Sequence, residues 1–328
     1  MDRVRLGNSD LDVSRICLGT VFRAFCDEDT CVAAIHEAGA QGCNYLDCAN
    51  VYGDGVGERV VGRAVKGQRD RYVISTKVGT PEVGVAGSGG LSRHEIMRAS
   101  EASLRRLDTD YLDCYLCHCP DPDTPLDETF GALNELVESG KVRYVGVSRF
   151  ESWRLHETLS TCATERFASP VCNQLLYSML DRRAEDEVVP YCRSRGVGVT
   201  VFAATCIGLL SGRYRFGQPP PRGSSWHRGP YNLRRAMTPQ VDRVIETLIE
   251  IATAHGKSPT QVAMAWCLAQ PGIDVVITGA DTPERVRENC GAAGWRLTAD
   301  ELDALDRLTE GHRIEVHKDC PEGWKEDS

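Results

Sequence analysis

The sequence predicts a single (β/α)8 barrel, and three observations support this fold class. Eight short runs of apolar and β-branched residues recur along the chain, as expected of buried strands. A helix-like segment follows each run, and no low-complexity linker divides the 328 residues. Eight strand–helix units close into a barrel, with any active site at the carboxyl ends of the strands.

The predicted elements begin with a hairpin, formed by residues 4–6 and 11–13 on either side of Gly7 and Asn8. Most of the strands that follow end about 30 residues apart, the length that a parallel strand–helix–strand unit needs. The last two strands are much further apart, and the Gly- and Pro-rich residues 214–235 predict a large loop between them. The eight strands are 16–20, 44–47, 72–77, 112–118, 144–148, 170–174, 198–202 and 274–278.

Helix boundary signals agree with this order of elements. Ser92 and Thr298 are each followed three residues later by a glutamate, which predicts a capping box at both sites. Ser258 and Thr282 each precede a proline, which predicts an N-cap followed by proline at the first helical position. Gly140 follows a helical apolar pattern and predicts the end of that helix.

The composition excludes several classes of protein. The chain has 38 Lys and Arg against 47 Asp and Glu, a net charge of −9, which argues against nucleic acid and membrane lipid as partners. No apolar run approaches the roughly 18 residues of a membrane span, and the N-terminus has no apolar signal core. We therefore predict a cytoplasmic protein whose 15 cysteines are reduced thiols; the pattern leaves the oligomeric state open.

Four chemically complementary residues are predicted to meet at one mouth of the barrel. Asp47, Lys77 and His118 end the second, third and fourth strands, and Tyr52 follows Asp47 closely. A cation lowers the pKa of a neighbouring tyrosine, so Lys77 would make Tyr52 a better acid–base group, with Asp47 holding Lys77. His118 would orient a carbonyl. This set suits hydride reduction of a carbonyl, because the alkoxide must be protonated as it forms.

These four residues, and a cysteine-rich stretch beside them, also suggest other interpretations. Taken singly, each of the four is more often structural than catalytic. A barrel glycosidase would need paired carboxylates, whereas Asp47 is the only carboxylate that directly ends a predicted strand. The Cys- and His-containing stretch 114–119 suits zinc, but adjacent strand residues face opposite sides. Cys117 and His118 therefore cannot easily bind one ion, and we predict no metal site.

Several motifs along the chain point to one protein family. Asp-Cys-Ala-Asn-Val-Tyr-Gly at 47–53 is similar to the pattern Asp-Thr-Ala-x-x-Tyr-Gly. Further matching stretches are 90–93, 103–107, 110–113, 140–146 and 208–214. Together they resemble the aldo-keto reductase family, nearly from end to end. The resemblance implies the barrel already predicted, a bound nicotinamide dinucleotide, and Tyr52 as the proton donor.

The resemblance also implies which residues bind the cofactor. Thr20 and Asp47 would line the nicotinamide pocket, and Phe202 would stack on the nicotinamide ring. The other implied contacts are Ser148, Arg149 and Gln174 at the carboxamide, Leu209, Gly212 and Arg213 at the pyrophosphate, and Gly279, Arg285, Glu288 and Asn289 at the adenosine.

Three positions bear on the choice of cofactor and on the family branch. Arg149 stands where the family most often has asparagine, and the Ser148-Arg149 pair resembles the branch that includes potassium-channel β subunits. Asp281 would repel an adenosine 2′-phosphate and favour NAD, whereas Arg285 favours NADP. We predict NADP, with NAD as the alternative.

Two segments are predicted to cover the site. The lid loop, residues 206–237, has no acidic residue or lysine between Arg213 and Arg235 but has arginines at 213, 215, 222, 228, 234 and 235. It is either a solvated loop or a lid over phosphate groups, with Trp226, His227 and Tyr231 lining a substrate pocket. The C-terminal tail, residues 310–328, either closes on the site or is disordered; it contains His312, His317, Cys320 and Trp324.

The sequence thus predicts one domain, residues 1–328, with an NADP(H)-dependent reductase activity on aldehydes or ketones. Sugar and nucleotide-sugar carbonyls are among the candidate substrates. The alternative is a cofactor-binding regulatory subunit with slow turnover, resembling channel β subunits.

Overall fold

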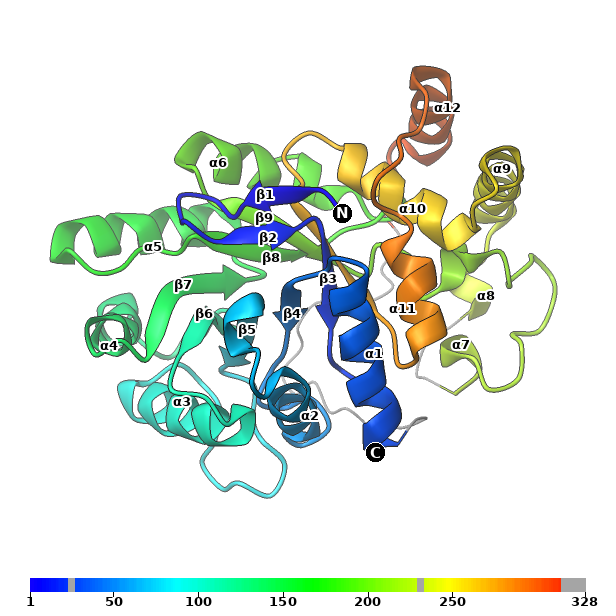
Figure 1. Cartoon of the computed structure of the whole chain (residues 1–328). Coiled ribbons are helices and arrows are strands. Elements are labelled where there is room, and N and C mark those ends of the chain that lie inside the picture. The colour runs from blue at the N-terminus through cyan, green and yellow to red at the C-terminus, as the bar shows by residue number, and fades with distance from the viewer. Residues whose placement is uncertain (23–26, 229–232, 314–328) are drawn as a thin grey trace.

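In the computed structural model, which describes residues 1–22, 27–228 and 233–313, eight parallel strands close into a barrel. The order around the barrel is β10-β3-β4-β5-β6-β7-β8-β9 (Figure 1). This confirms the predicted fold class, and each predicted strand coincides with an observed one to within about two residues at either end. The strands are β3 (Ile16–Gly19), β4 (Tyr45–Asp47), β5 (Val73–Val78), β6 (Leu112–Cys117), β7 (Val142–Ser148), β8 (Cys172–Leu176), β9 (Gly198–Phe202) and β10 (Val275–Gly279).

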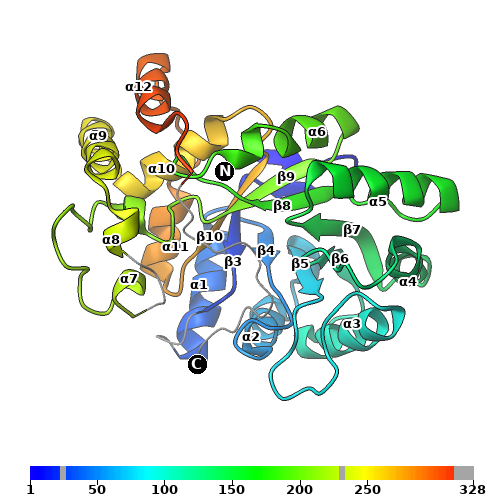
Figure 2. The same cartoon turned by 180° about the vertical axis from the view of Figure 1, so that it is seen from behind.

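Helices surround the strands on the outside of the barrel, as the two opposite views show (Figures 1 and 2). The helices are α1 (Glu28–Ala40), α2 (Val56–Val65), α3 (Arg93–Leu107), α4 (Leu126–Glu138), α5 (Ser152–Glu165), α6 (Val188–Arg195), α7 (Ser225–Arg228), α8 (Leu233–Ala236), α9 (Pro239–His255), α10 (Pro259–Ala269), α11 (Pro283–Cys290) and α12 (Ala299–Thr309). Short 3-10 turns are η1 (Arg69–Arg71), η2 (Arg183–Glu185) and η3 (Leu209–Ser211).

The predicted N-terminal hairpin is present and closes the end of the barrel opposite the strand carboxyl ends. Its strands, β1 (Arg3–Arg5) and β2 (Asp12–Ser14), pair antiparallel. Leu6, Leu11 and Val13 of this hairpin belong to the buried cluster inside the barrel. Gly7, with φ +54°, lies so close to the barrel that a Cβ there would stand 2.1 Å from the Val171 carbonyl oxygen, so only glycine fits this turn.

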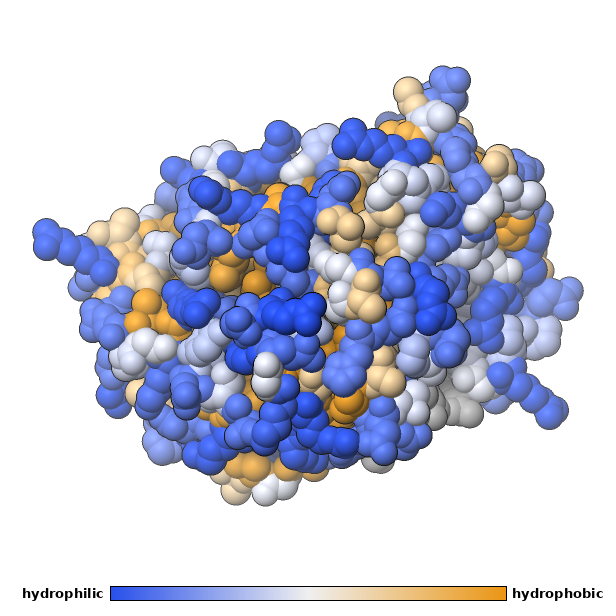
Figure 3. Space-filling view, in the orientation of Figure 1, coloured by the Kyte–Doolittle hydropathy of each residue, from blue (hydrophilic) through white to orange (hydrophobic). Residues whose placement is uncertain are grey.

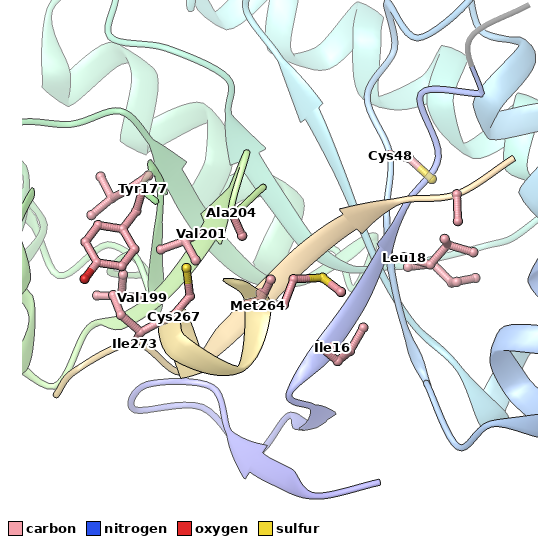
Figure 4. Packing of buried hydrophobic residues seen from close by; sticks show 14 of the residues in the cluster. Ile16, Leu18, Cys48, Tyr177, Val199, Val201, Ala204, Met264, Cys267 and Ile273 are labelled. Carbon is pink, nitrogen blue, oxygen red and sulfur yellow. The ribbon is translucent and has the colours of Figure 1, made fainter. Parts of the chain in front are cut away.

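The buried residues form two clusters, one inside the barrel and one between the strands and the helices. Along β6, Cys114 and Leu116 belong to the inner cluster, whereas Tyr115 and Cys117 belong to the outer one. This is the alternation expected of a strand, and it puts Cys117 on the face opposite the interior. In the outer cluster, Cys267 of α10 lies beside strand β9 (Figure 4).

Two thiols meet inside the barrel because the strand between them has a glycine at that level. Gly146 of β7 lies between β6 and β8, and a Cβ there would stand 2.8 Å from the Cys172 sulfur and 3.3 Å from the Cys114 sulfur. The two sulfur atoms are 4.0 Å apart. Every cysteine in the described ranges is a free thiol, and all of them except Cys119 are buried. Cysteine serves here mainly as a small buried side chain.

The helix boundary signals are confirmed with one exception. Thr298 forms a complete capping box, Ser258 and Thr282 are N-caps followed by proline, and Ser258 also forms a box with Gln261. At Ser92 only half of the predicted box forms. The Glu95 carboxylate there accepts hydrogen bonds from the Gly89 amide and from Arg98 instead of returning to the cap.

The long connection between β9 and β10 contains more than the large loop predicted at residues 214–235. After η3 it contains two short helices, α7 and α8, and then two full helices, α9 and α10. Helix α9 is therefore an addition to the regular strand–helix repeat, and it packs against α10 and α12.

The surface in Figure 3 is mostly hydrophilic, with hydrophobic residues in small separate patches. Among the described residues, no helix combines the length and the apolar character needed to cross a bilayer.

Candidate active site

The structure brings the four residues of the predicted catalytic set together at the carboxyl end of the barrel. Asp47 is the last residue of β4, Lys77 lies in β5 and His118 follows β6. These three strands are neighbours in the sheet, so their ends meet. Tyr52 lies on the loop from β4 to α2, and all four side chains are buried, with Tyr52 and His118 retaining 9 % exposure.

The Lys77 ammonium has three contacts within hydrogen-bond distance. Its Nζ lies 2.6 Å from Asp47 Oδ2, 2.6 Å from the Cys48 carbonyl oxygen and 3.2 Å from the Tyr52 hydroxyl oxygen. An ammonium has three protons to donate, so each of them has an acceptor. This arrangement fixes the ammonium beside the tyrosine.

The other Asp47 oxygen is also fully engaged. Oδ1 accepts hydrogen bonds from Ser75 Oγ at 2.8 Å and from Gln174 Nε2 at 3.0 Å. A buried ion pair is stable only when its remaining polar atoms are satisfied, and Ser75 and Gln174 satisfy those of Asp47. The Asp47 carboxylate is therefore held in place, and it holds the Lys77 ammonium in turn.

The electrostatics of the three titratable groups differ. Burial lowers the pKa of Lys77, but Asp47 and Tyr52 outweigh burial and leave that pKa raised. Burial raises the pKa of Tyr52, and Lys77 only partly offsets it. The effect of Lys77 thus has the predicted direction, but burial is larger, so Tyr52 is a protonated group able to donate. Burial, reinforced by Lys77 and Arg149, holds the pKa of His118 well below its usual range, so its imidazole is neutral.

His118 is held by a residue that the sequence did not indicate. The Thr80 hydroxyl oxygen lies 3.2 Å from His118 Nδ1, and the rings of His118 and Tyr52 meet edge to face at 6.0 Å. Thr80 stands three residues after Lys77, at the start of a Gly-rich loop. Its contact leaves the Nε2 side of the imidazole for other partners.

The residues implied for the nicotinamide end lie around the same mouth. Thr20 Oγ1 donates to the Asp47 carbonyl oxygen at 3.1 Å. The Ser148 hydroxyl and the Arg149 backbone amide both donate to the Gln174 carbonyl oxygen, at 3.0 and 2.8 Å. The Arg149 guanidinium lies over the ring of Phe202 at 5.2 Å. The residues expected at the carboxamide are thus adjacent to one another, and Gln174 also contacts Asp47.

The segment implied for the pyrophosphate has features that fit an anion. Gly208 and Gly212, with φ +80° and +78°, flank η3, which contains the buried Leu209. The Ser211 hydroxyl in this turn is buried and has no hydrogen-bond partner within the described ranges. Arg213 follows, exposed to solvent. A buried hydroxyl with no partner beside an arginine suits phosphate oxygens.

The residues implied for the adenosine end lie at the beginning and end of α11. Arg285 is exposed, with Nη1 3.9 Å from Asp281 Oδ2, and Glu288 is exposed as well. Asn289 donates to Thr278 Oγ1 at 2.7 Å and to the Gly279 carbonyl oxygen, so it joins α11 to the end of β10. The N-terminus of α11 retains the partial positive charge that favours anions.

The described part of the lid loop is partly anchored. Arg215 donates to the carboxylates of Asp242 and Glu246 on α9, so its charge is neutralised. Trp226 is buried and its indole N–H donates to the Ile207 carbonyl oxygen at 3.1 Å, which makes it a packing residue of the loop. Tyr231 and residues 314–328 of the predicted tail, with His317, Cys320 and Trp324, lie outside the described residues.

The buried carboxylate of Glu58 was also missed by the sequence analysis. Thr76 and Arg106 donate to its two oxygens at 2.5 and 2.6 Å, which ties α2, β5 and α3 together one residue from Lys77. Within the part of the chain that the structure describes, no group of three or more His, Cys, Asp or Glu side chains could hold a metal ion.

The barrel and this site define the class of protein as a nicotinamide-dependent oxidoreductase, and comparison with known proteins agrees. A model described as the Aldo/keto reductase family matches residues 15–310. The chain therefore belongs to the aldo/keto reductase family.

Similar curated proteins cover almost the whole chain. An uncharacterized oxidoreductase, YrpG, of Bacillus subtilis is 34% identical over 324 residues, which are 95% of this chain and 97% of the relative. A probable voltage-gated potassium channel subunit beta of Arabidopsis thaliana is 32% identical over 94% of this chain and 97% of its own. The aldo-keto reductase YhdN of Bacillus subtilis is 29% identical over 94% of each chain.

Proposed function

We propose that the protein uses NADP(H) to reduce the carbonyl group of an aldehyde or ketone, with Tyr52 as the proton donor. The observation that carries this proposal is the contact of Lys77 Nζ with the Tyr52 hydroxyl at 3.2 Å, in a site that also contains a neutral His118. A bound nicotinamide supplies the hydride. The chain supplies the proton and the fixed positions of the reacting groups.

Each residue of the site has a separate part in this chemistry. The Tyr52 hydroxyl donates its proton to the carbonyl oxygen as negative charge develops there. Lys77, held by Asp47, favours the tyrosinate that this transfer leaves. The neutral His118 orients the carbonyl oxygen as a hydrogen-bond donor. We assign the nicotinamide pocket to Thr20, Ser148, Gln174 and Phe202 among the residues already described.

NADP is the proposed cofactor because the exposed guanidinium of Arg285 is accessible to a 2′-phosphate. Its guanidinium lies 3.9 Å from the Asp281 carboxylate and is 61% exposed, so the pair is loose and accessible. The pyrophosphate would lie at Leu209, Gly212 and Arg213, and the adenosine at Gly279, Glu288 and Asn289. We further propose one cytoplasmic domain, residues 1–328, in which residues 206–237 form a lid over the cofactor and substrate.

A second candidate function is a cofactor-binding regulatory subunit with slow turnover. The observation that favours it is the 32% identity to a relative named as a probable potassium channel subunit beta. The two functions share the cofactor site and differ in the rate of the chemical step.

The test is a fluorescence titration of the purified protein with NADPH and NADH, followed by a screen of aldehydes, ketones, sugars and nucleotide sugars. We expect tighter binding of NADPH and steady turnover of at least one carbonyl compound. Tighter binding of NADH would overturn the cofactor assignment and implicate Asp281. Tight NADPH binding without multiple turnovers of any carbonyl would favour the regulatory subunit.

A further inference from the structure

Arg149 has an unusual backbone conformation directly after strand β7. Its φ is +60°, in the left-handed region that non-glycine residues rarely adopt. The Gln174 carbonyl oxygen fixes this conformation, because it accepts the Arg149 amide hydrogen bond at 2.8 Å. Gln174 in turn donates to Asp47. Gln174 therefore places Arg149 through its backbone carbonyl and holds the Asp47 carboxylate through its side chain. Strained residues of this kind are concentrated at functional sites.

The guanidinium of Arg149 has a ring contact but no anion. It lies over Phe202 at 5.2 Å, and the Arg149 side chain is only partly buried. Within the described ranges its guanidinium makes no hydrogen bond and no ion pair. Its positive charge acts on both Tyr52 and His118, although burial is the larger influence on each. The charge therefore faces the groups that would carry out the reaction.

Three carboxylates around the catalytic set already have partners. Asp47 is paired with Lys77, and Glu58 with Arg106. Asp121 accepts hydrogen bonds from the Leu91 amide and the Thr124 hydroxyl. Because His118 is neutral and the Asp47–Lys77 pair cancels itself, the Arg149 charge has no counter-charge among these groups.

The cofactor end that reaches this mouth would not neutralise that charge. A carboxamide oxygen can accept a hydrogen bond from a guanidinium, but it carries no negative charge, and an oxidised nicotinamide ring is itself positive. A guanidinium binds carboxylate or phosphate oxygens in a bidentate manner. The missing partner therefore has the chemistry of such an anion.

We propose that Arg149 binds an anionic group of the substrate, so that the preferred substrates are carbonyl compounds that carry a carboxylate or phosphate. This inference rests on the proposed reductase function and names its substrate class. The partly buried guanidinium then has a counter-ion only in the substrate complex, which selects charged carbonyl compounds over neutral ones of the same shape.

The first test compares kcat/KM for matched aldehydes at saturating cofactor. One pair is 4-carboxybenzaldehyde and methyl 4-formylbenzoate, and the other is glycolaldehyde phosphate and glycolaldehyde. We expect the wild type to prefer the charged member of at least one pair by about tenfold or more. Arg149→Met should reduce this ratio about tenfold, and Arg149→Lys should retain part of it. Which pair responds distinguishes a carboxylate from a phosphate.

A matched control is available at Arg166, which follows helix α5. It is exposed and has the same φ of +60°, so Arg166→Met removes an arginine from the same backbone conformation outside the site. We expect this variant to keep the wild-type ratio. An equal ratio in the wild type and in Arg149→Met would overturn the proposal.

The second test does not depend on turnover. Benzoate and benzamide are titrated into the protein–NADPH complex while cofactor fluorescence is followed. Tighter binding of benzoate that is lost in Arg149→Met would support the anion site even if no carbonyl compound were reduced, which would refute only the reductase function. Equal benzoate binding by both proteins would overturn the anion site. So would an Arg149→Met variant in which only NADPH binding is weakened, because Arg149 would then be a cofactor ligand.

Discussion

The Lys77 ammonium nitrogen lies 3.2 Å from the Tyr52 hydroxyl oxygen, and this contact joins strand β5 to the loop that follows strand β4. The other two hydrogen bonds of the ammonium go to Asp47 and to the Cys48 carbonyl, so it cannot turn away from the tyrosine without losing both. The family motif that residues 47–53 resemble has threonine where this chain has Cys48. The replacement of threonine by Cys48 does not affect the contact with Lys77, because the backbone carbonyl oxygen of residue 48 accepts that hydrogen bond.

Replacing Tyr52 tests the assignment of the proton donor. Tyr52→Phe removes the hydroxyl and keeps the ring, so the contact with His118 is retained. We expect kcat to fall by about 10² to 10⁴, the usual contribution of general acid catalysis, while the Kd for NADPH changes less than threefold. Undiminished turnover in stopped-flow and steady-state assays would show that another group donates the proton.

Replacing Asp47 tests what holds Lys77 in place. Asp47→Asn leaves the Lys77 ammonium in a fully buried site without its counter-charge, and breaking a buried pair in this way costs about 3–5 kcal/mol. We expect a lower free energy of unfolding in urea and a large loss of kcat. The double variant Asp47→Asn, Lys77→Met should recover part of the stability and none of the turnover. A single variant as stable as the wild type would contradict this.

The depressed pKa of His118 predicts how stability depends on pH. The folded protein keeps this imidazole neutral, whereas an unfolded histidine binds a proton below pH 6.5, its ordinary pKa. The unfolded chain then binds more protons than the folded one, so stability is greatest above pH 6.5 and decreases as the pH falls below it. The loss approaches about 1.4 kcal/mol per pH unit. Urea unfolding at pH 7.5 and 5.5 measures it, and His118→Gln should show a shallower decrease.

The Thr80 hydroxyl predicts a graded effect on the orientation of His118. Thr80→Val has almost the same shape but cannot form the 3.2 Å contact with Nδ1, so the imidazole loses its fixed tautomer and orientation. We expect kcat to fall about tenfold and the pH profile of kcat to shift. Thr80→Ser keeps the hydroxyl and should restore most of the rate. Equal rates for the valine and serine variants would rule out this role.

The buried carboxylate of Glu58 predicts an effect on stability. Arg106→Met leaves Glu58 without its cation, although Thr76 still donates to it. We expect a loss of about 3 kcal/mol in the free energy of unfolding. Arg105→Met, on the same helix turn with no contact to Glu58 in the described structure, is the control and should be close to neutral. Equal stabilities of the two variants would contradict the prediction.

The parts of the fold that sequence reasoning found are those controlled by local patterns. The strands were found because each is a short apolar run, and the barrel then followed from their spacing. The set Asp47, Lys77 and His118 was found because the carboxyl ends of neighbouring parallel strands must meet. The proximity of these three residues can therefore be predicted without knowing how the helices and loops pack.

The rest depends on contacts between distant segments. Thr80 and Glu58 have no sequence pattern of their own, since each acts through a partner that only the closed barrel brings near. Gln174 was expected at the carboxamide, and its bond to Asp47 spans 127 residues of sequence. Helix α9, before the last strand, was not predicted because it is an addition outside the regular strand–helix repeat.

The thiols of Cys114 and Cys172 lie close together, but their backbones are too far apart for a disulfide to form between them. They are 4.0 Å apart because Gly146 leaves room for both, yet a whole strand separates their backbones. Two strand spacings amount to roughly 9 to 10 Å, beyond the Cα separation of about 7 Å that a disulfide can bridge. An oxidant that reaches the barrel interior would therefore find two neighbouring sulfur atoms that cannot be joined to each other while the barrel is intact.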